Sequence, residues 1–121
     1  MNQKQRKRYR DKLDSIATDI ARERTGGLCE VRLSPDCNGQ GCEVHHGAKK
    51  KTNAQRYFLE AHVYTCRPCH SILGDTATNK EFMIGKIGKE TWEKAVWLRN
   101  VHKVTLSEVE EELNEYKRHD K

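Results

Sequence analysis

Apolar residues recur at helical spacing near both ends of the chain, whereas residues 28 to 75 show no such repeat. Near the N-terminus, the repeat predicts an amphipathic helix. This helix is expected to end at Gly26, because glycine readily adopts the left-handed backbone that follows a last helical turn. The apolar positions of the helix are Leu13, Ile16, Ala17, Ile20 and Ala21.

The last third of the chain predicts three helices in succession. Asn79 is a suitable N-cap for the first of them, and Gly88 is expected to end it. Trp92 begins the apolar stripe of the second. Ser107 and Glu110 form the pattern of a capping box at the start of the third. We expect the apolar stripes of these helices to pack into a core, and we assign them no chemistry.

The middle of the chain predicts two short strands, over residues 42–46 and 61–66, followed by a helix that begins near Pro68. A small sheet flanked by terminal helices is an α+β fold. The predicted organisation is a basic arm and helix over residues 1–27, a core over residues 28–78 and a helical extension over residues 79–121.

The composition limits the partners of the chain. Of its 121 residues, 35% are hydrophobic and 34% are charged, so the core is thin and a bound metal would contribute much of the stability. The net charge of +5 favours an anionic partner such as nucleic acid. The pattern predicts neither a membrane span nor a signal peptide, because no apolar run is long enough. The basic first twelve residues are either a solvated tail or an arm that binds phosphate.

Four of the five cysteines predict a structural zinc site. Cys66 and Cys69 have two residues between them, a spacing that lets both thiolates reach one tetrahedral ion. Cys29 and Cys37 are the expected second pair, but their wider spacing makes Cys42 an alternative ligand. If it is not a ligand, Cys42 is expected to be buried at the start of a strand. An odd number of cysteines, with such a pair beside a histidine, favours a cytoplasmic metalloprotein over a secreted disulfide scaffold.

Histidines form a second group of candidates. His45 and His46 are adjacent in a predicted strand, where neighbouring side chains point to opposite faces, so one suits metal binding and the other a different task. His70 directly follows Cys69 and is not needed by the zinc, so it is available for another site. One metal ion and a neutral histidine that takes a proton from water can together hydrolyse a phosphodiester. The alternative is an accidental pair and a surface histidine. His62 either supports this site or is an ordinary polar strand residue.

The histidine pair, followed by Cys-Arg-Pro-Cys-His at residues 66–70, resembles the HNH, or ββα-metal, endonuclease family. The resemblance implies two antiparallel strands, a loop and a helix, braced by a four-cysteine zinc site. It also implies that His45 and His70 bind a divalent ion such as Mg²⁺ or Mn²⁺, and that His46 is the general base. The position of the family's central asparagine carries Ala61 in this chain.

Other segments are similar to the phage NinG (Rap) recombination proteins, which are nucleases that act on branched DNA. The similar segments are residues 20–24, 56–57, 84–92 and 103–117. The wide spacing of Cys29 and Cys37 and the histidine at position 70, where that family often has asparagine, are departures. This resemblance implies a recombination nuclease in the host cytoplasm, with phage or host recombination proteins as partners.

DNA is the substrate that these observations predict. Basic residues on or beside the loop after the first strand are expected to contact phosphates, which would make binding depend steeply on salt. They are Lys49, Lys50, Lys51, Arg56 and Arg67. A solvated loop is the alternative for the lysines. Cutting both strands at one place needs two active sites, so a homodimer is compatible with this function. A phage nickase linked to DNA packaging, and a zinc-finger module that binds DNA without cutting it, are the competing functions.

Overall fold

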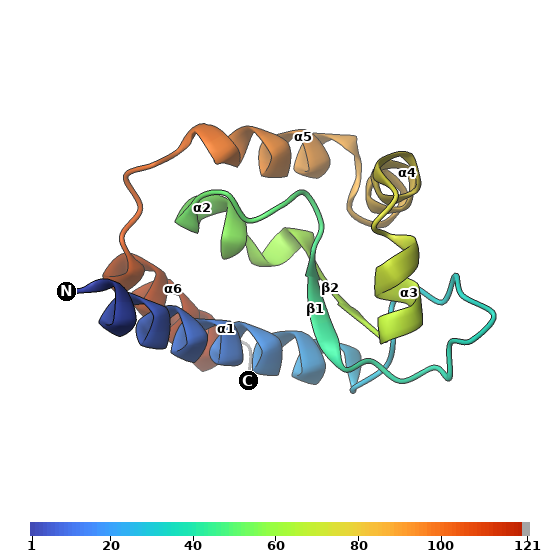
Figure 1. Cartoon of the computed structure of the whole chain (residues 1–121), viewed down its shortest axis with the longest axis horizontal. Coiled ribbons are helices and arrows are strands. Elements are labelled where there is room, and N and C mark those ends of the chain that lie inside the picture. Colours follow the sequence, from blue (N-terminus) through green and yellow to red (C-terminus); the bar gives the residue numbers. More distant parts are fainter. Residues whose placement is uncertain (120–121) are drawn as a thin grey trace.

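The computed structural model describes residues 1–119 as an α+β fold with a two-stranded antiparallel sheet (Figure 1). The elements are α1 (Gln3–Thr25), β1 (Glu43–His46), α2 (Asn53–Arg56), a 3₁₀ turn (Leu59–Ala61), β2 (His62–Thr65), α3 (Arg67–Ile72), α4 (Thr76–Ile87), α5 (Lys89–Trp97), a second 3₁₀ turn (Leu98–Asn100) and α6 (Leu106–His119). The predicted strands and the helix near Pro68 are confirmed. No helix in this part of the chain is long and apolar enough to cross a membrane. The helical extension predicted to residue 121 is described as far as residue 119.

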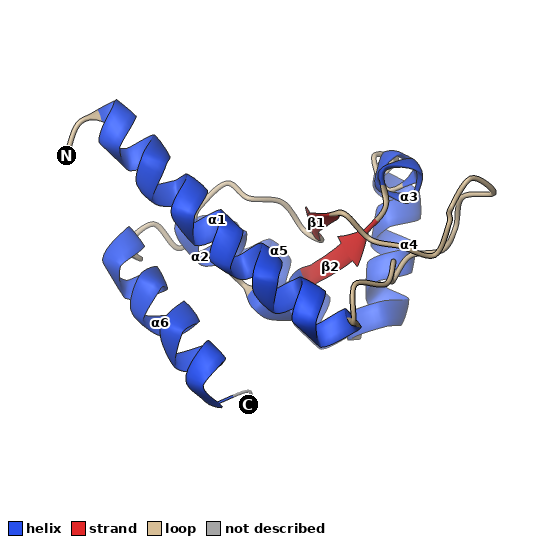
Figure 2. Cartoon of the chain, turned by 90° about the horizontal axis from the view of Figure 1, so that it is seen from below, coloured by secondary structure: helices blue, strands red, loops and turns tan. Residues whose placement is uncertain are grey.

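Helix α1 begins well before the apolar repeat, so the basic arm is itself helical. The side chain of Asn2 accepts a hydrogen bond from the N–H of Gln5, and the Gln5 side chain accepts one from the N–H of Asn2. This capping box satisfies two of the N–H groups at the helix start. Gly26 ends α1 with a φ of 65°, as predicted. Figure 2 shows α6 running beside α1. Their shared core consists of Leu13, Ala17, Ile20, Tyr57, Val109 and Leu113.

The sheet lies between α1 on one face and α3 with α4 on the other (Figure 1). Strands β1 and β2 pair with His45 opposite Val63 and His46 opposite His62. Because successive strand residues alternate between faces, His45 and Val63 share one face. Val63 packs into the core formed by α3 and α4, so His45 faces those helices. His46 and His62 share the face that meets α1.

The start of α4 differs from the sequence prediction. Asp75, rather than Asn79, is the N-cap, and its carboxylate accepts a hydrogen bond from the N–H of Thr78 at 2.9 Å. Asp75 directly precedes the first helical residue, whereas Asn79 lies about one turn inside the helix. The Asn79 side chain is therefore available for another contact. Gly88 ends α4, as predicted.

The start of α6 also differs from the sequence prediction. Thr105 and Glu108 form its capping box, with the Glu108 N–H bonded to the Thr105 hydroxyl at 3.1 Å, in place of Ser107 and Glu110. The chain contains both patterns in overlapping positions, so spacing alone cannot choose between them. Helix α6 begins at Leu106, so Thr105 directly precedes it and Ser107 lies inside it. The Glu110 carboxylate is bound instead by Lys12 of α1 at 2.7 Å.

Candidate metal centre and histidine pocket

Four cysteine sulfur atoms from separate parts of the chain converge beside the sheet. The Sγ atoms of Cys29, Cys37, Cys66 and Cys69 all lie within 4.8 Å of one another, and those of Cys29 and Cys66 are 3.8 Å apart. Zinc–sulfur bonds of about 2.3 Å in a tetrahedron place two sulfurs about 3.8 Å apart. The cluster therefore fits a structural zinc ion held by the four ligands that the sequence predicts.

Two local structures bring these sulfur atoms together. A loop after α1 returns Cys37 to the neighbourhood of Cys29, because the N–H of Cys29 donates to the carbonyl of Gly39 at 3.0 Å. The turn from β2 into α3 supplies the other pair. Cys66 is the N-cap residue of α3, and Cys69 lies in the first turn of that helix. The metal site thus joins the end of α1 to the start of α3.

The surroundings of the sulfur atoms favour thiolates. Three backbone N–H groups donate to sulfur at 3.4 Å: Cys66 to Cys29, Ser34 to Cys69 and Gly39 to Cys37. Burial opposes ionisation of Cys29, but backbone N–H groups, among them that of Arg32, outweigh it and lower the pKa of this thiol. Burial raises the pKa of Cys66. Since one thiolate disfavours a second beside it, a cation is needed to keep all four sulfurs deprotonated.

Cys42 lies outside the cluster, so Cys37 rather than Cys42 completes the group of four sulfur atoms that could hold a zinc ion. The prediction that Cys42 is buried is wrong, because its side chain is exposed. Cys42 precedes β1, which begins at Glu43, and its N–H donates to the carbonyl of Thr65 at 3.0 Å. Its backbone therefore continues the sheet pairing while its side chain reaches solvent.

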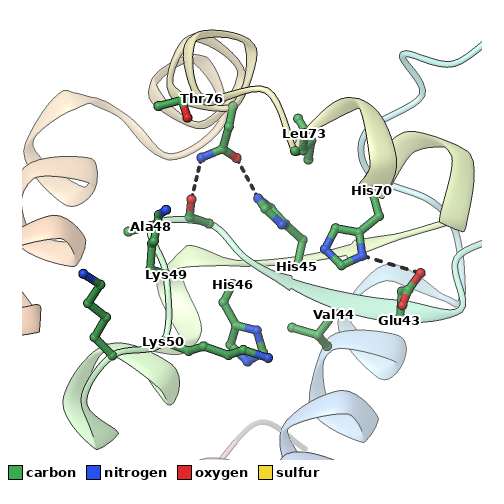
Figure 3. A pocket seen from close by; sticks show the side chains of 14 residues that line it. Glu43, Val44, His45, His46, Ala48, Lys49, Lys50, His70, Leu73 and Thr76 are labelled. Carbon is green, nitrogen blue, oxygen red and sulfur yellow. Dashed lines mark hydrogen bonds and ion pairs between the residues drawn. The ribbon is translucent and has the colours of Figure 1, made fainter.

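His45 and His70 face each other in a pocket of about 560 Å³. Their ring centroids lie 5.1 Å apart with an interplanar angle of 71°. Figure 3 shows both rings turned into the same space, one from β1 and one from α3. His70 directly follows Cys69, so the cysteine cluster fixes the helix that presents it. The two histidines predicted to share an ion are thus neighbours in space.

Asn79 of α4 orients the ring of His45. Its Nδ2 donates to the carbonyl of Gly47 at 2.8 Å, which leaves Oδ1 2.6 Å from Nε2 of His45 (Figure 3). An amide oxygen can only accept, so Nε2 carries the ring proton and Nδ1 keeps its lone pair. Burial, only partly offset by this hydrogen bond, lowers the pKa of His45. The ring is therefore neutral near pH 7 and able to bind a cation.

Glu43 holds a corresponding position beside His70. It precedes His45 by two residues and so lies on the same face of β1. Its Oε1 is 3.5 Å from Nδ1 of His70, which leaves Nε2 for a metal ion. Within residues 1–119, the four cysteines are the one group of three or more such donors whose ligand atoms lie within 4.8 Å of one another. His45 and His70 offer two ligands, and a hard divalent ion commonly completes its shell with water and substrate oxygens.

His46 lies on the other face of β1, beside His62. Their ring centroids are 4.9 Å apart, as their direct pairing across the strands dictates. His62 is buried, and its Nε2 donates to the carbonyl of Arg56 at 2.7 Å, while its Nδ1 bonds to no residue from 1 to 119. Burial lowers the pKa of His62 to about 4. Burial and the nearby His62, Arg56 and Lys50 lower the pKa of His46 to about 3.

The basic residues predicted to bind phosphate divide into two groups. The lysines over residues 49–51 line the histidine pocket. Arg56 instead binds both carboxylate oxygens of Asp14, at 3.0 and 2.6 Å, and joins α2 to α1. Its side chain is therefore not available for a phosphate in this conformation. Arg67 is exposed at the first residue of α3.

Comparisons with protein-family models, with curated proteins and with solved structures find no match to this chain. The resemblance to HNH nucleases accordingly rests on the motif residues alone. The geometry of the site is what supports a function.

Two residues of the histidine pocket were not predicted from the sequence. Glu43 could have been found, because residues two apart in a strand share a face and Glu43 precedes His45 by two. Asn79 has no comparable signal. Its place beside His45 depends on how α4 packs over the sheet, which short-range patterns do not determine.

Proposed function

We propose that the chain is a metal-dependent DNA endonuclease of HNH type that hydrolyses phosphodiester bonds. One observation carries this proposal: His45 and His70 share a pocket, and each ring has one nitrogen beside an outer oxygen, hydrogen-bonded to Asn79 in the case of His45 and 3.5 Å from the Glu43 carboxylate in the case of His70. This arrangement reserves the second nitrogen of each ring for the pocket. Metal-binding histidines are typically oriented in this way by an outer acceptor.

The residues of the pocket fit separate tasks. His45 and His70 would hold a divalent ion such as Mg²⁺ or Mn²⁺. When bound, such an ion stabilises negative charge on the phosphate and on the leaving oxygen. His46 contributes to the lining of the same pocket at the end of β1, although its ring lies beside His62 on the other face of the strand. Its lowered pKa keeps the ring neutral, and we assign it to take a proton from the attacking water. The lysines over residues 49–51 attract the phosphate backbone at the rim of the pocket.

The four-cysteine site supports this chemistry as scaffolding. It fixes α3, which carries His70, against the sheet that carries His45. The substrate that we propose first is branched recombination DNA, because short segments similar to phage recombination proteins occur at intervals from residue 20 to residue 117. Duplex, nicked and four-way-junction substrates compared side by side would rank this choice against a general nickase.

The direct test is cleavage of supercoiled plasmid and of a four-way junction by zinc-loaded protein. Reactions with Mg²⁺, with Mn²⁺ and with neither ion are compared, and cutting is expected only where an ion is added. Calorimetric titration of Mn²⁺ into the zinc-loaded protein should detect one exchangeable ion per chain in addition to the zinc. Wild-type protein that binds DNA but cuts none of these substrates with either ion would be a non-catalytic zinc module.

Histidine variants assign the roles. His45→Ala and His70→Ala should lose both Mn²⁺ binding and cutting, whereas His46→Ala should lose cutting and keep Mn²⁺ and DNA affinity nearly unchanged. His102→Ala is the matched control, because His102 is exposed and does not line the pocket. Zinc content and circular dichroism verify that each variant is folded.

A further inference from the structure

The first turns of α1 and the start of α6 enclose a second hollow of about 790 Å³, which we call the arm groove. Figures 1 and 2 show these two segments next to each other. Three basic side chains line the arm groove, those of Arg6, Lys7 and Arg10, and no acidic residue does. The groove therefore presents positive charge to solvent at the end of the molecule where the chain begins.

Acidic groups close to the arm groove are already engaged by cations of α1. The pairs are Asp11 with Lys7 at 2.9 Å and Glu110 with Lys12 at 2.7 Å. In contrast, Arg6 and Arg10 form no ion pair with any residue from 1 to 119. Each guanidinium is a fixed charge that offers planar pairs of N–H donors. Both are thus available to an external anion.

The linings of the arm groove and of the histidine pocket come close together along the chain. Lys51 lines the pocket and Asn53 lines the groove, so only Thr52 separates the two hollows along the chain. This corner is fixed, because the Thr52 hydroxyl donates to the carbonyl of Leu98 at 2.8 Å and Asn53 donates to that of Val104 at 2.9 Å. Basic side chains therefore border both hollows on either side of a rigid corner.

We infer that the arm groove binds the phosphate backbone of the same DNA molecule whose scissile phosphate lies in the histidine pocket. The inference rests on the proposed nuclease function and extends its substrate to a duplex that continues past the cleavage point. Arg6 and Arg10 lie about 6 Å apart along α1, one helical turn. DNA presents a phosphate about every 3.4 Å along each strand, so both side chains can reach one strand.

Nucleic acid fits the arm groove better than a membrane surface does. A helix that lies on lipid needs an exposed apolar face. The apolar face of α1 is instead buried against α6, with Leu13, Ala17 and Ile20 in the shared core. The exposed side chains near the start of α1 are mostly basic, and lysines also line the histidine pocket. Positive charge at both hollows suits a polyanion such as DNA.

The test compares two double variants of equal charge. Arg6→Ala with Arg10→Ala removes the two free cations of the groove, and Lys4→Ala with Arg8→Ala removes two exposed cations of the same turns that do not line it. Binding to a fluorescent duplex is measured by anisotropy over a range of salt concentrations. The protein is zinc-loaded and free of Mg²⁺ and Mn²⁺, so that no cutting occurs, and any tag is placed at the C-terminus.

The groove variant is expected to bind about tenfold more weakly than wild type, and the slope of log K against log salt should fall by about 1.8, or about 0.9 for each lost contact. The control variant should stay close to wild type. Equal losses in the two variants, or no loss in either, would overturn the inference. So would unchanged DNA affinity of the groove variant together with lost binding to phosphatidylserine vesicles or to polyglutamate, which would assign the groove to lipid or to an acidic protein.

The same protein separates this inference from the nuclease proposal. Wild-type protein that cuts no DNA in Mn²⁺ removes the nuclease function, whereas the comparison of the two double variants depends on binding alone. A selective loss in the groove variant would then identify the arm groove as a DNA contact of a non-catalytic module.

Discussion

The Nε2 atom of His45 lies 2.6 Å from Oδ1 of Asn79, although Asn79 belongs to helix α4, outside the two strands and the helix that carry the histidines. The other end of the same amide donates to the carbonyl of Gly47. One side chain therefore ties α4 to the end of β1 at two points. Helix α4 therefore contributes to the histidine pocket in addition to packing against the core.

Asn79→Ala is expected to weaken Mn²⁺ binding by about 10- to 100-fold, because the His45 ring loses the acceptor that fixes its tautomer and direction. Calorimetry on the zinc-loaded protein measures this loss. Asn79→Asp keeps an acceptor for His45 but loses the donor to Gly47, so its affinity for Mn²⁺ should lie between those of wild type and of Asn79→Ala. Lys80→Ala, at an exposed neighbouring position, is the control. Wild-type affinity in Asn79→Ala would remove Asn79 from the site.

The parts of the site that the sequence predicts are those governed by short-range geometry. The Cys66–Cys69 spacing specifies a zinc half-site, and strand alternation places His45 and His46 on opposite faces. The pairing of His46 with His62 was beyond prediction, because the register of two strands joined by residues 47–61 is not set by a tight turn.

Long-range partners explain most of the remaining differences. Arg56 reads as one more cation of a basic loop, yet it binds Asp14, which lies 42 residues earlier. Glu110 reads as part of a capping box, yet it binds Lys12 of α1. In both cases a distant side chain competes successfully with the local pattern, and only the folded chain brings the two together.

The Arg56 pair leads to a second prediction. Arg56→Ala should lower the free energy of unfolding by about 1 kcal/mol, because Asp14 is left partly buried without its partner. Lys50→Ala should leave stability nearly unchanged but weaken DNA binding more than Arg56→Ala does. Urea unfolding and anisotropy measure the two effects. A larger loss of DNA affinity in Arg56→Ala would return Arg56 to the phosphate contacts.

The cysteine cluster predicts opposite outcomes for two cysteines only five residues apart. Cys37→Ser should lose the zinc ion and much of the fold, because a domain of this size depends on metal binding for stability. Cys42→Ser should retain one zinc per chain and its melting temperature, since Cys42 is exposed and outside the cluster. Elemental analysis and thermal unfolding test both. Zinc loss in Cys42→Ser would contradict the ligand set.

Buried His62 predicts acid sensitivity. Its pKa of about 4 lies below the value of about 6.5 for an unfolded histidine, so the unfolded chain binds more protons between these values and stability falls as the pH is lowered through this range. From about pH 7 to about pH 5 the part of this loss that is due to His62 should be about 2 kcal/mol. His46, whose pKa is also lowered, adds a loss of its own that a His62 variant keeps. The facing groups are His46, Arg24, Arg56 and Asp14. His62→Gln can still donate to the Arg56 carbonyl and does not titrate, so urea unfolding of this variant should show a flatter pH dependence. The same slope in both proteins would exclude His62 as the cause.

The lysine loop contains a backbone position that suits glycine better than lysine. Lys49 has a φ of 148°, which L-residues rarely adopt, whereas the neighbouring Lys50 has no positive φ. Lys49→Gly should therefore raise the free energy of unfolding by about 1 kcal/mol, and Lys50→Gly should lower it by about 0.5 kcal/mol through the greater freedom of the unfolded chain. Lys49→Gly and Lys50→Gly each remove one charge from the rim of the histidine pocket. Both variants should therefore weaken DNA binding to a similar extent. If stability changes in opposite directions while both variants lose a similar amount of DNA affinity, the backbone at Lys49 is strained and the charge of Lys49 contributes to DNA binding. If urea unfolding instead shows Lys49→Gly to be destabilised as much as Lys50→Gly, the backbone at residue 49 is not strained.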